Sequence, residues 1–179
     1  MNKALKPYSM VTDYATGKPV PNIGSEENRQ QIERYLVEKK GFDKKDIEVD
    51  AEIRLKVDGT DYRSRVDLVV STGKKRFMAI KSAAGSLDSW EREIVSAARL
   101  LDRYQLPISL VSDGETALVI DTVSGKKTGQ GMQAIPSKRD AQEMMDATRL
   151  LPVSGERLRK EMLIFRSYDV MNVNVGRNL

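Results

Sequence analysis

Strict alternation of apolar and polar side chains marks the longest predicted strand, which covers residues 47–57. Its apolar positions are Ile47, Val49, Ala51, Ile53, Leu55 and Val57. Because successive side chains of a strand point to opposite faces, one face is expected to pack on a core while the other stays polar. Asp58-Gly59 follows directly and is a typical hairpin turn, so this strand is predicted to pair with the next one.

A second hairpin is predicted over residues 62–81. Both halves alternate, and the polar, glycine-containing segment 71–75 between them is the expected turn. Pairing residues of like parity places Asp67 opposite Ala79 or Lys81, with the carboxylate and the ammonium on one face. The other face is expected to be apolar; its members are Val66, Leu68, Val70, Met78 and Ile80.

Apolar residues at helical spacing predict helices around these strands. The first is expected over 25–40, the second from 86 or 88 to 104, a third from Ser137 and a fourth over 155–165, with a frayed tail after Tyr168. Short apolar strands are expected at 108–111 and 117–120. The order strand, helix, strand predicts a right-handed crossover and therefore one parallel pair. These elements predict an α/β fold with a mixed five-stranded sheet flanked by helices.

Three segments are expected along the chain. Residues 1–23 are predicted to form a short arm or hairpin that lies across the surface, residues 24–135 the core, and residues 136–179 a C-terminal helical extension. The length of 179 residues suits one domain with a modest core.

Composition removes several kinds of chemistry. The chain has no cysteine and no histidine, so thiolate or imidazole metal sites and histidine-based triads are excluded. Acid–base or metal chemistry must use Asp, Glu, Lys, Tyr or water. The formal net charge of +4 favours an anionic partner such as nucleic acid, although many soluble proteins carry this charge. No apolar run is long enough for a membrane span and no signal peptide is visible, so a cytoplasmic location is expected.

Three segments of the sequence resemble parts of a known protein family. The segment 24–30 (GSEENRQ), the Arg-Val-Asp-Leu-Val-Val run that ends at Val70, and Met78-Ala79-Ile80-Lys81 occur in the order helix, meander, helix and two strands. In this order they resemble the N-terminal nuclease domain of type I restriction enzyme R subunits, within the PD-(D/E)xK nuclease superfamily. The match covers roughly residues 20–125. The superfamily motif is short, so its specificity comes from the element order. The resemblance implies a restriction-endonuclease-like core and Mg²⁺-dependent cleavage of DNA.

The resemblance also implies roles for particular residues. Asp67 matches the metal-binding Asp, and Lys81 matches the Lys that positions the attacking water and stabilises the developing phosphorane charge. Glu26 best matches a helical Glu that joins the metal site, with Glu27 as the near alternative. Mg²⁺ is the implied cofactor and Mn²⁺ its substitute. DNA and other restriction–modification subunits are the implied partners.

The chain departs from the family pattern at Ala79, where the motif has Glu or Asp. Three explanations stay open: an engineered inactivation, a naturally degenerate branch, or a carboxylate that has migrated to the following helix. Glu91 and Glu93 are the candidates for such migration, and both are equally explained as solvated helix charges. Asp50 or Glu52 are further candidates for the missing ligand. A non-catalytic module that binds nucleic acid or a protein partner is therefore the alternative function.

Basic residues surround the predicted hairpin and are candidates for contacts with DNA phosphates. They are Arg63, Arg65, Lys74, Lys75 and Arg76. A charged hairpin is equally explained as a device that keeps a sheet edge soluble. The chain has no phosphate-binding G-x-x-x-x-G-K-[ST] loop, because residues 124–127 lack its spacing. We therefore expect no ATP-driven translocation by this chain alone.

Overall fold

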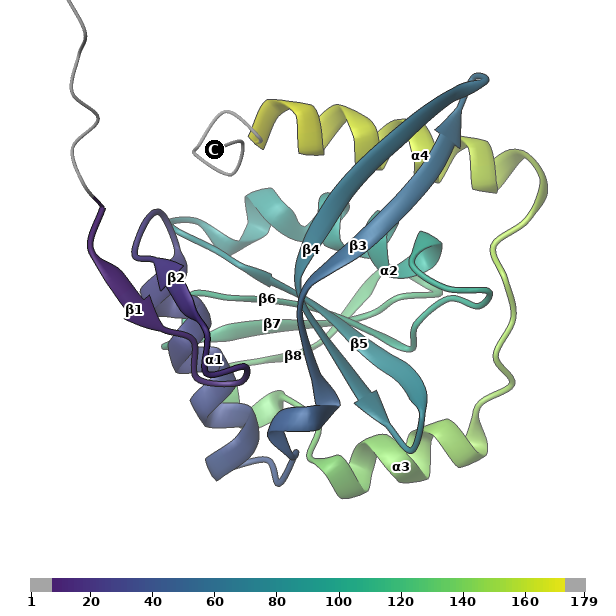
Figure 1. Cartoon of the computed structure of the whole chain (residues 1–179). Coiled ribbons are helices and arrows are strands. Elements are labelled where there is room, and N and C mark those ends of the chain that lie inside the picture. The colour runs from purple at the N-terminus through teal and green to yellow at the C-terminus, as the bar shows by residue number, and fades with distance from the viewer. Residues whose placement is uncertain (1–7, 173–179) are drawn as a thin grey trace, which may run out of the picture.

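A computed structural model of the chain describes residues 8–172. Its centre is a six-stranded sheet with helices on both faces (Figure 1). The strands lie in chain order: β3 (Ile47–Val57), β4 (Thr60–Thr72), β5 (Lys75–Ser82), β6 (Ile108–Ser112), β7 (Ala117–Asp121) and β8 (Lys126–Gln130). β5 and β6 are parallel and the other neighbours are antiparallel. The predicted α/β class, mixed sheet and parallel crossover are confirmed.

The predicted number of five strands was wrong, because β8 adds a sixth at the edge of the sheet. Its sequence is Lys-Lys-Thr-Gly-Gln, and four of these five residues are exposed. The strand forms because its backbone pairs with β7, as in Leu118 opposite Gln130. A short edge strand that buries no apolar face leaves no alternation in the sequence, and its charged residues are typical of edges.

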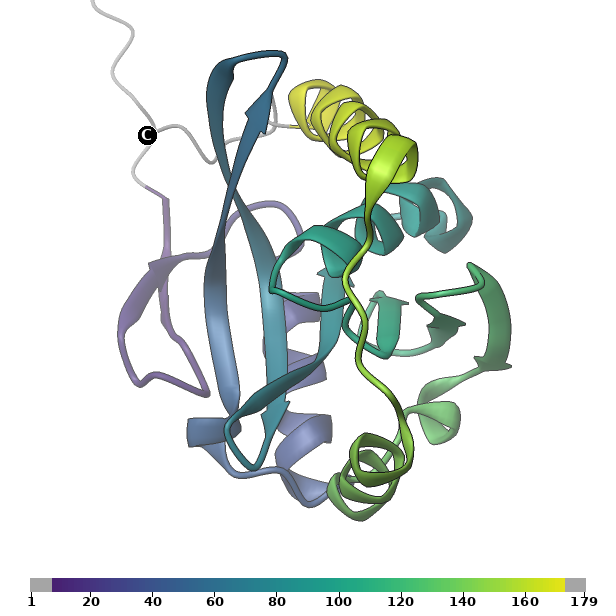
Figure 2. The ribbon, with the colours of Figure 1, turned by 90° about the vertical axis from the view of Figure 1, so that its right-hand side faces the viewer.

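Apolar side chains fill two clusters, one on each face of the sheet. On one face, Ile32 of α1 (Glu26–Glu38) and Ala141 of α3 (Lys138–Ala147) pack against Leu68 and Ile80. On the other, α2 (Glu91–Leu100) and α4 (Gly155–Asn172) pack against Val69, Ala79 and Val66. Figure 2 shows α4 and α2 side by side on this second face.

The position of Val66 corrects the predicted apolar face of the hairpin. Val66 lies in the second cluster, whereas Leu68 lies in the first. The β3–β4 pair is long and twisted, and Asp50 of β3 has a positive φ of 53°. Twist and this local kink turn the outer half of the β3–β4 pair relative to the inner half, so parity alone does not assign one face along its whole length.

The helices differ from prediction mainly at their ends. The predicted second helix is divided into a 3₁₀ turn at Leu87–Trp90 followed by α2. Short 3₁₀ turns also lie at Lys44–Asp46 and Met132–Ala134. The last helix continues to Asn172, and Asp169 within it is buried, so the prediction of fraying directly after Tyr168 was wrong. Residues 173–179 of the predicted tail lie outside the described part.

The N-terminal arm forms a two-stranded hairpin from β1 (Met10–Thr12) and β2 (Pro19–Pro21). Its turn carries Asp13, which is completely buried and accepts hydrogen bonds from the backbone and the hydroxyl of Thr16. The hairpin is therefore anchored into the domain at Asp13 and does not simply lie across its surface. Residues 1–7 of the predicted arm lie outside the described part.

Candidate active site

Lys81 lies between two buried carboxylates from neighbouring elements. Its Nζ is 3.4 Å from Oε1 of Glu93 on α2 and 3.9 Å from Oδ2 of Asp67 on β4. The side chain of Lys81 is 17% exposed, and those of Asp67 and Glu93 are 1% and 6% exposed. Buried carboxylates need compensation by a nearby positive charge, and Lys81 supplies it to both.

Sheet register brings Asp67 and Lys81 together. Val69 lies opposite Ala79 and Leu68 opposite Ile80, so Lys81 and not Ala79 is the residue nearest to Asp67 along the second strand. The backbone N–H of Ser82 donates to Oδ2 of Asp67 at 2.8 Å. The hairpin itself therefore fixes the carboxylate and the ammonium on one face.

Trp90 covers the outer side of Lys81. The Lys81 Nζ lies 4.5 Å from the centroid of the indole ring, within range of a cation–π interaction. Trp90 ends the 3₁₀ turn that precedes α2, and Glu93 follows it in the first turn of that helix. One short segment therefore supplies both the ring and the second carboxylate that restrict the position of the ammonium.

The start of α1 is attached to the end of β5. The Ser82 hydroxyl donates to the carbonyl of Ser25 at 3.0 Å, and the Asn28 side-chain amide donates to the carbonyl of Ala83 at 2.7 Å. These bonds place the first turn of α1, which carries Glu26, next to the strand that carries Lys81.

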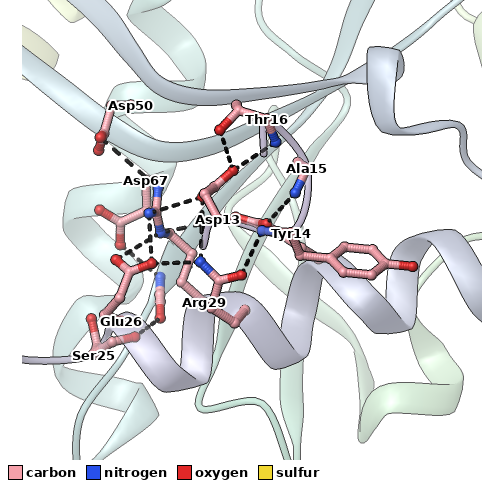
Figure 3. A network of polar contacts seen from close by, with 12 residues as sticks. Asp13, Tyr14, Ala15, Thr16, Ser25, Glu26, Arg29, Asp50 and Asp67 are labelled. Carbon is pink, nitrogen blue, oxygen red and sulfur yellow. Dashed lines mark hydrogen bonds and ion pairs between the residues drawn. The ribbon is translucent and has the colours of Figure 1, made fainter. Parts of the chain in front are cut away.

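Arg29 organises the acidic residues beside this site (Figure 3). Its guanidinium donates to both carboxylate oxygens of Glu26, at 3.1 and 2.7 Å, and lies 3.1 Å from Asp13. Asp50 lies 3.9 Å from its Nη1. Because Glu26 also accepts from Gln30 at 2.7 Å, its carboxylate is engaged with residues of its own helix.

Glu33 is the buried acid on the other side of Arg29. Its side chain is fully buried, and its Oε2 accepts from the backbone N–H of Ala15 at 3.0 Å. Burial, followed by the nearby charge of Asp13, raises the pKa of Glu33 to about 7. This group therefore changes its protonation state near neutral pH.

The predicted basic cluster is divided into two groups by the fold. Arg63 and Arg65 lie on the outer half of β4, whereas Lys74 and Lys75 lie at the β4–β5 turn. Lys74 stands nine positions after Arg65, which corresponds to about 30 Å of extended chain. Arg76 donates to Glu48 and to the carbonyl of Leu101, so it has a structural role in linking β5 to β3 and to the end of α2.

Comparison with protein families agrees with this arrangement of elements. The family described as "Type I restriction enzyme R protein N terminus (HSDR_N)" matches residues 24–136. The chain belongs to this family. Neither the search of curated proteins nor the search of solved structures gave a match.

Within this HSDR_N domain, Ala79 is fully buried and apolar in its surroundings. It packs in the second cluster with residues such as Val69 and Ala98. Its side chain lies on the face shared by Asp67 and Lys81, two residues away from Lys81 along β5. A carboxylate at this position would point toward the site, and alanine supplies none.

The two migration candidates occupy different environments. Glu93 faces Lys81 and is 5% exposed, so the interpretation as a solvated helix charge was wrong for it. Glu91 instead pairs with Lys127 at 2.7 Å, on the side of β8. Only Glu93 of these two therefore lies beside the Lys81 ammonium.

The other acidic candidates lie outside this group. Glu27 is exposed and accepts from Asn22, and Glu52 is exposed and pairs with Arg54 at 2.7 Å. Among residues 8–172, no group of three or more acidic side chains is arranged to hold a metal ion. The carboxylates nearest to Lys81 are thus a pair, from Asp67 and Glu93.

The sequence pattern did not identify three further members of this region, which are Arg29, Asp13 and Glu33. The only signal was spacing, because Arg29 stands three residues after Glu26 and four before Glu33 on one helix face. The contribution of Asp13 depends on how the N-terminal hairpin docks, and that has no local signature.

No helix in the described part of this HSDR_N chain is both long enough and apolar enough to cross a membrane.

Proposed function

We propose that this domain cleaves phosphodiester bonds of DNA with the help of a divalent cation held by Asp67 and Glu93. One observation carries the proposal: two buried carboxylates lie within 4 Å of the Lys81 ammonium on a fold of the HSDR_N family. Paired carboxylates beside a lysine are the groups that metal-assisted phosphodiester hydrolysis requires. In this proposal Glu93 replaces the carboxylate that Ala79 lacks.

The donor set fits Mg²⁺. This cation is usually held by one or two protein carboxylates and completes its shell with water and substrate phosphate. Asp67 and Glu93 supply two hard oxygen donors from two elements. When bound, the cation supplies charge stabilisation for the phosphoryl oxygens, and Mn²⁺ is the expected substitute.

We assign two roles to Lys81: it positions the attacking water, and it stabilises the negative charge that develops in the transition state. In hydrolysis the water oxygen bonds to phosphorus and the phosphorus–oxygen bond to the leaving strand breaks, while the attacking water gives a proton to solvent and the leaving oxygen takes one from solvent. An ammonium beside the scissile group stabilises the additional negative charge of the transition state. Trp90 and Glu93 hold the Lys81 side chain in the position this role needs.

Glu26 is assigned a supporting role. Its carboxylate holds Arg29 and Gln30, which attach α1 to Asp13 of the N-terminal hairpin. It would bind a cation only after release of Arg29, so we place it outside the pair. DNA and other restriction–modification subunits remain the proposed partners, and the cytoplasm the proposed location.

A non-catalytic module that binds nucleic acid or a protein partner is the second candidate. The observation that favours it is Ala79, together with the absence of a three-acid group among residues 8–172. A module of this kind needs no divalent cation, and its binding to DNA falls steeply with salt.

Metal titration separates the two functions. Trp90 is the only tryptophan and lies on Lys81, so its fluorescence reports on the site directly. We expect Mg²⁺ and Mn²⁺ to change this fluorescence and to give a calorimetric binding signal. Asp67→Asn and Glu93→Gln should each abolish both signals, whereas Glu91→Gln, the control on the same helix, should bind as the parent does.

Two outcomes contradict the nuclease proposal. If only an Ala79→Glu variant binds metal, position 79 is the broken ligand and the parent is the non-catalytic module. If metal binds, cleavage of plasmid DNA should follow, and Lys81→Gln should reduce its rate by about 10²–10³-fold. Unchanged cleavage in Lys81→Gln or Asp67→Asn would exclude this site.

A further inference from the structure

The outer half of the β3–β4 pair forms a two-stranded ribbon that extends away from the rest of the sheet and runs alongside α4 (Figure 1). Arg54 lies directly opposite Arg63, Glu52 opposite Arg65, and Lys56 opposite Asp61. These six residues share one parity on each strand and are all exposed. We call this set the ribbon face.

The opposite face of the ribbon is covered by α4. Tyr62 and Ser64 donate hydrogen bonds to the buried carboxylate of Asp169, and Ile53 lies in the second apolar cluster. Because strand side chains alternate, the ribbon face points away from α4 and into solvent. The backing by α4 holds the ribbon in place and leaves its charged side available for a ligand.

Charge on the ribbon face is positive and incompletely neutralised. Like charges directly opposite each other, as Arg54 and Arg63 are, destabilise a strand pair. Arg54 is relieved by Glu52 at 2.7 Å. Arg63 and Arg65 have no salt bridge within 4.0 Å to any residue in the range 8–172. The paired arginines lower the stability of the free protein, and a bound anion would compensate for this repulsion.

The ribbon face leads to the candidate active site. Arg65 stands two residues before Asp67 on β4, and Glu52 stands two residues after Asp50 on β3, so the ribbon face ends beside the site although the strand pair turns between them. Each step of two residues advances about 7 Å, which corresponds to about two axial steps of 3.4 Å between the phosphates of one strand of duplex DNA. A phosphate backbone that follows the row of arginines therefore approaches Asp67 and Lys81.

We propose that the ribbon face binds the phosphate backbone of duplex DNA and guides it to Asp67 and Lys81. This inference rests on the proposed function, because it deepens the account of how that site receives its substrate. Arginine donates to phosphate oxygens in bidentate geometry, and backbone contacts of this kind position a protein on DNA without reading its sequence. Binding through the ribbon face is therefore independent of sequence and needs no divalent cation.

Equilibrium binding of a fluorescent DNA duplex of about 25 base pairs, followed by anisotropy at several salt concentrations without divalent metal, tests this proposal. We expect the double variant Arg54→Gln/Arg63→Gln to weaken binding about tenfold and to lower the salt slope by about 2. The matched control is Lys74→Gln/Lys75→Gln, which removes the same charge at the distant β4–β5 turn. This control should bind within about twofold of the parent.

The outcomes separate this inference from the proposed function. Equal weakening in both double variants would show a general charge effect and would overturn the inference, as would unchanged binding in Arg54→Gln/Arg63→Gln. Metal binding reported by Trp90 should be the same in the parent and in both double variants. DNA binding through the ribbon without metal binding at Asp67 would support the inference while it refutes the nuclease proposal, and metal binding without ribbon-dependent DNA binding would do the reverse.

Discussion

Two cations, the half-buried Lys81 and the buried Arg29, determine how acidic side chains are placed in this domain. Lys81 neutralises Asp67 and Glu93 across three elements, and Arg29 contacts Asp13 and Glu26 across two. A buried ion pair is not a strong source of stability, but removal of one partner leaves an uncompensated charge that is costly. Each cation therefore compensates the buried charge of the carboxylates that it contacts.

At the scale of single residues, the raised pKa of Glu33 leads us to expect that the stability of the protein depends on pH. Its folded pKa of about 7 lies above the ordinary value near 4.5, so the folded state binds the proton more tightly than the unfolded state. The contribution of this group is thus fully present below about pH 4.5 and is lost as pH rises through 7, by about 2–4 kcal/mol. Urea unfolding between pH 5 and 8 should show this decline.

The variant Glu33→Gln should flatten that decline, because glutamine carries no charge at any pH. Glu38→Gln, at an exposed position of the same helix, is the control and should keep the slope of the parent. If Glu33→Gln retains the full slope, another group is responsible for it.

Residue-scale predictions from the sequence succeeded where one hairpin decides the geometry. The shared face of Asp67 and Lys81 follows from the two-residue period of neighbouring strands, and the register agrees with it. The sequence pattern could not distinguish the environment of Glu91 from that of Glu93. They stand two residues apart on one helix, and only the docking of α2 turns one toward Lys81 and the other toward Lys127.

At the scale of elements, α4 shows how a charged helix is held. Its buried positions are Glu161, Phe165 and Asp169, which follow one another at four-residue spacing. Glu161 pairs with Arg99 of α2, and Asp169 accepts from Tyr62 of β4. Burial and this hydrogen bond raise the pKa of Tyr62. Because two of its three anchors are acidic, the helix carries a weak apolar stripe.

Phe165 is the apolar anchor of α4, so we expect its replacement to lower the stability of the protein strongly. It is 1% exposed and packs in the second cluster, so Phe165→Ala should lower the free energy of unfolding by about 3–5 kcal/mol. Leu163→Ala changes a residue of the same helix that is 38% exposed, and we expect an effect of about 0.5 kcal/mol or less. Chemical denaturation measures both. Similar losses in the two variants would mean that α4 is not anchored through Phe165.

The elements predicted best are those with a complete apolar pattern. The strand predicted over 47–57 has the observed bounds, and Asp58-Gly59 forms its turn with both residues at positive φ. Elements with a partial pattern were misjudged. β8 was missed because it is polar, and α4 was ended too early because its last buried residue is an aspartate.

At the scale of the whole molecule, one sheet is shared by two apolar clusters. Leu68 and Ile80 belong to the first cluster, while Val69 and Ala79, their neighbours in the same strands, belong to the second. Loss of packing on one face therefore loosens the strands that support the other. Such an arrangement favours a single cooperative unfolding transition.

Leu36→Ala tests this coupling from the face remote from the tryptophan. Leu36 is fully buried in the first cluster, whereas Trp90 packs against the second. We expect unfolding followed by Trp90 fluorescence and by far-ultraviolet circular dichroism to coincide, and both to shift by about 2–5 kcal/mol. Ile94→Ala, a substitution in the second cluster, should also shift both probes together. A Trp90 transition that stays unchanged in Leu36→Ala would show two independent units.

The sequence alone determined the fold class, the antiparallel meander with its parallel crossover, and the face that Asp67 shares with Lys81. These features depend on local periods of two and 3.6 residues and on short turns, which neighbouring residues decide. Only the tertiary structure decided that Glu93 faces Lys81, that Arg29 gathers Asp13 and Glu26, and that the basic residues divide between two distant ends of β4. These features depend on how helices and hairpins dock on the sheet. Docking brings together residues whose spacing in the sequence follows no regular pattern.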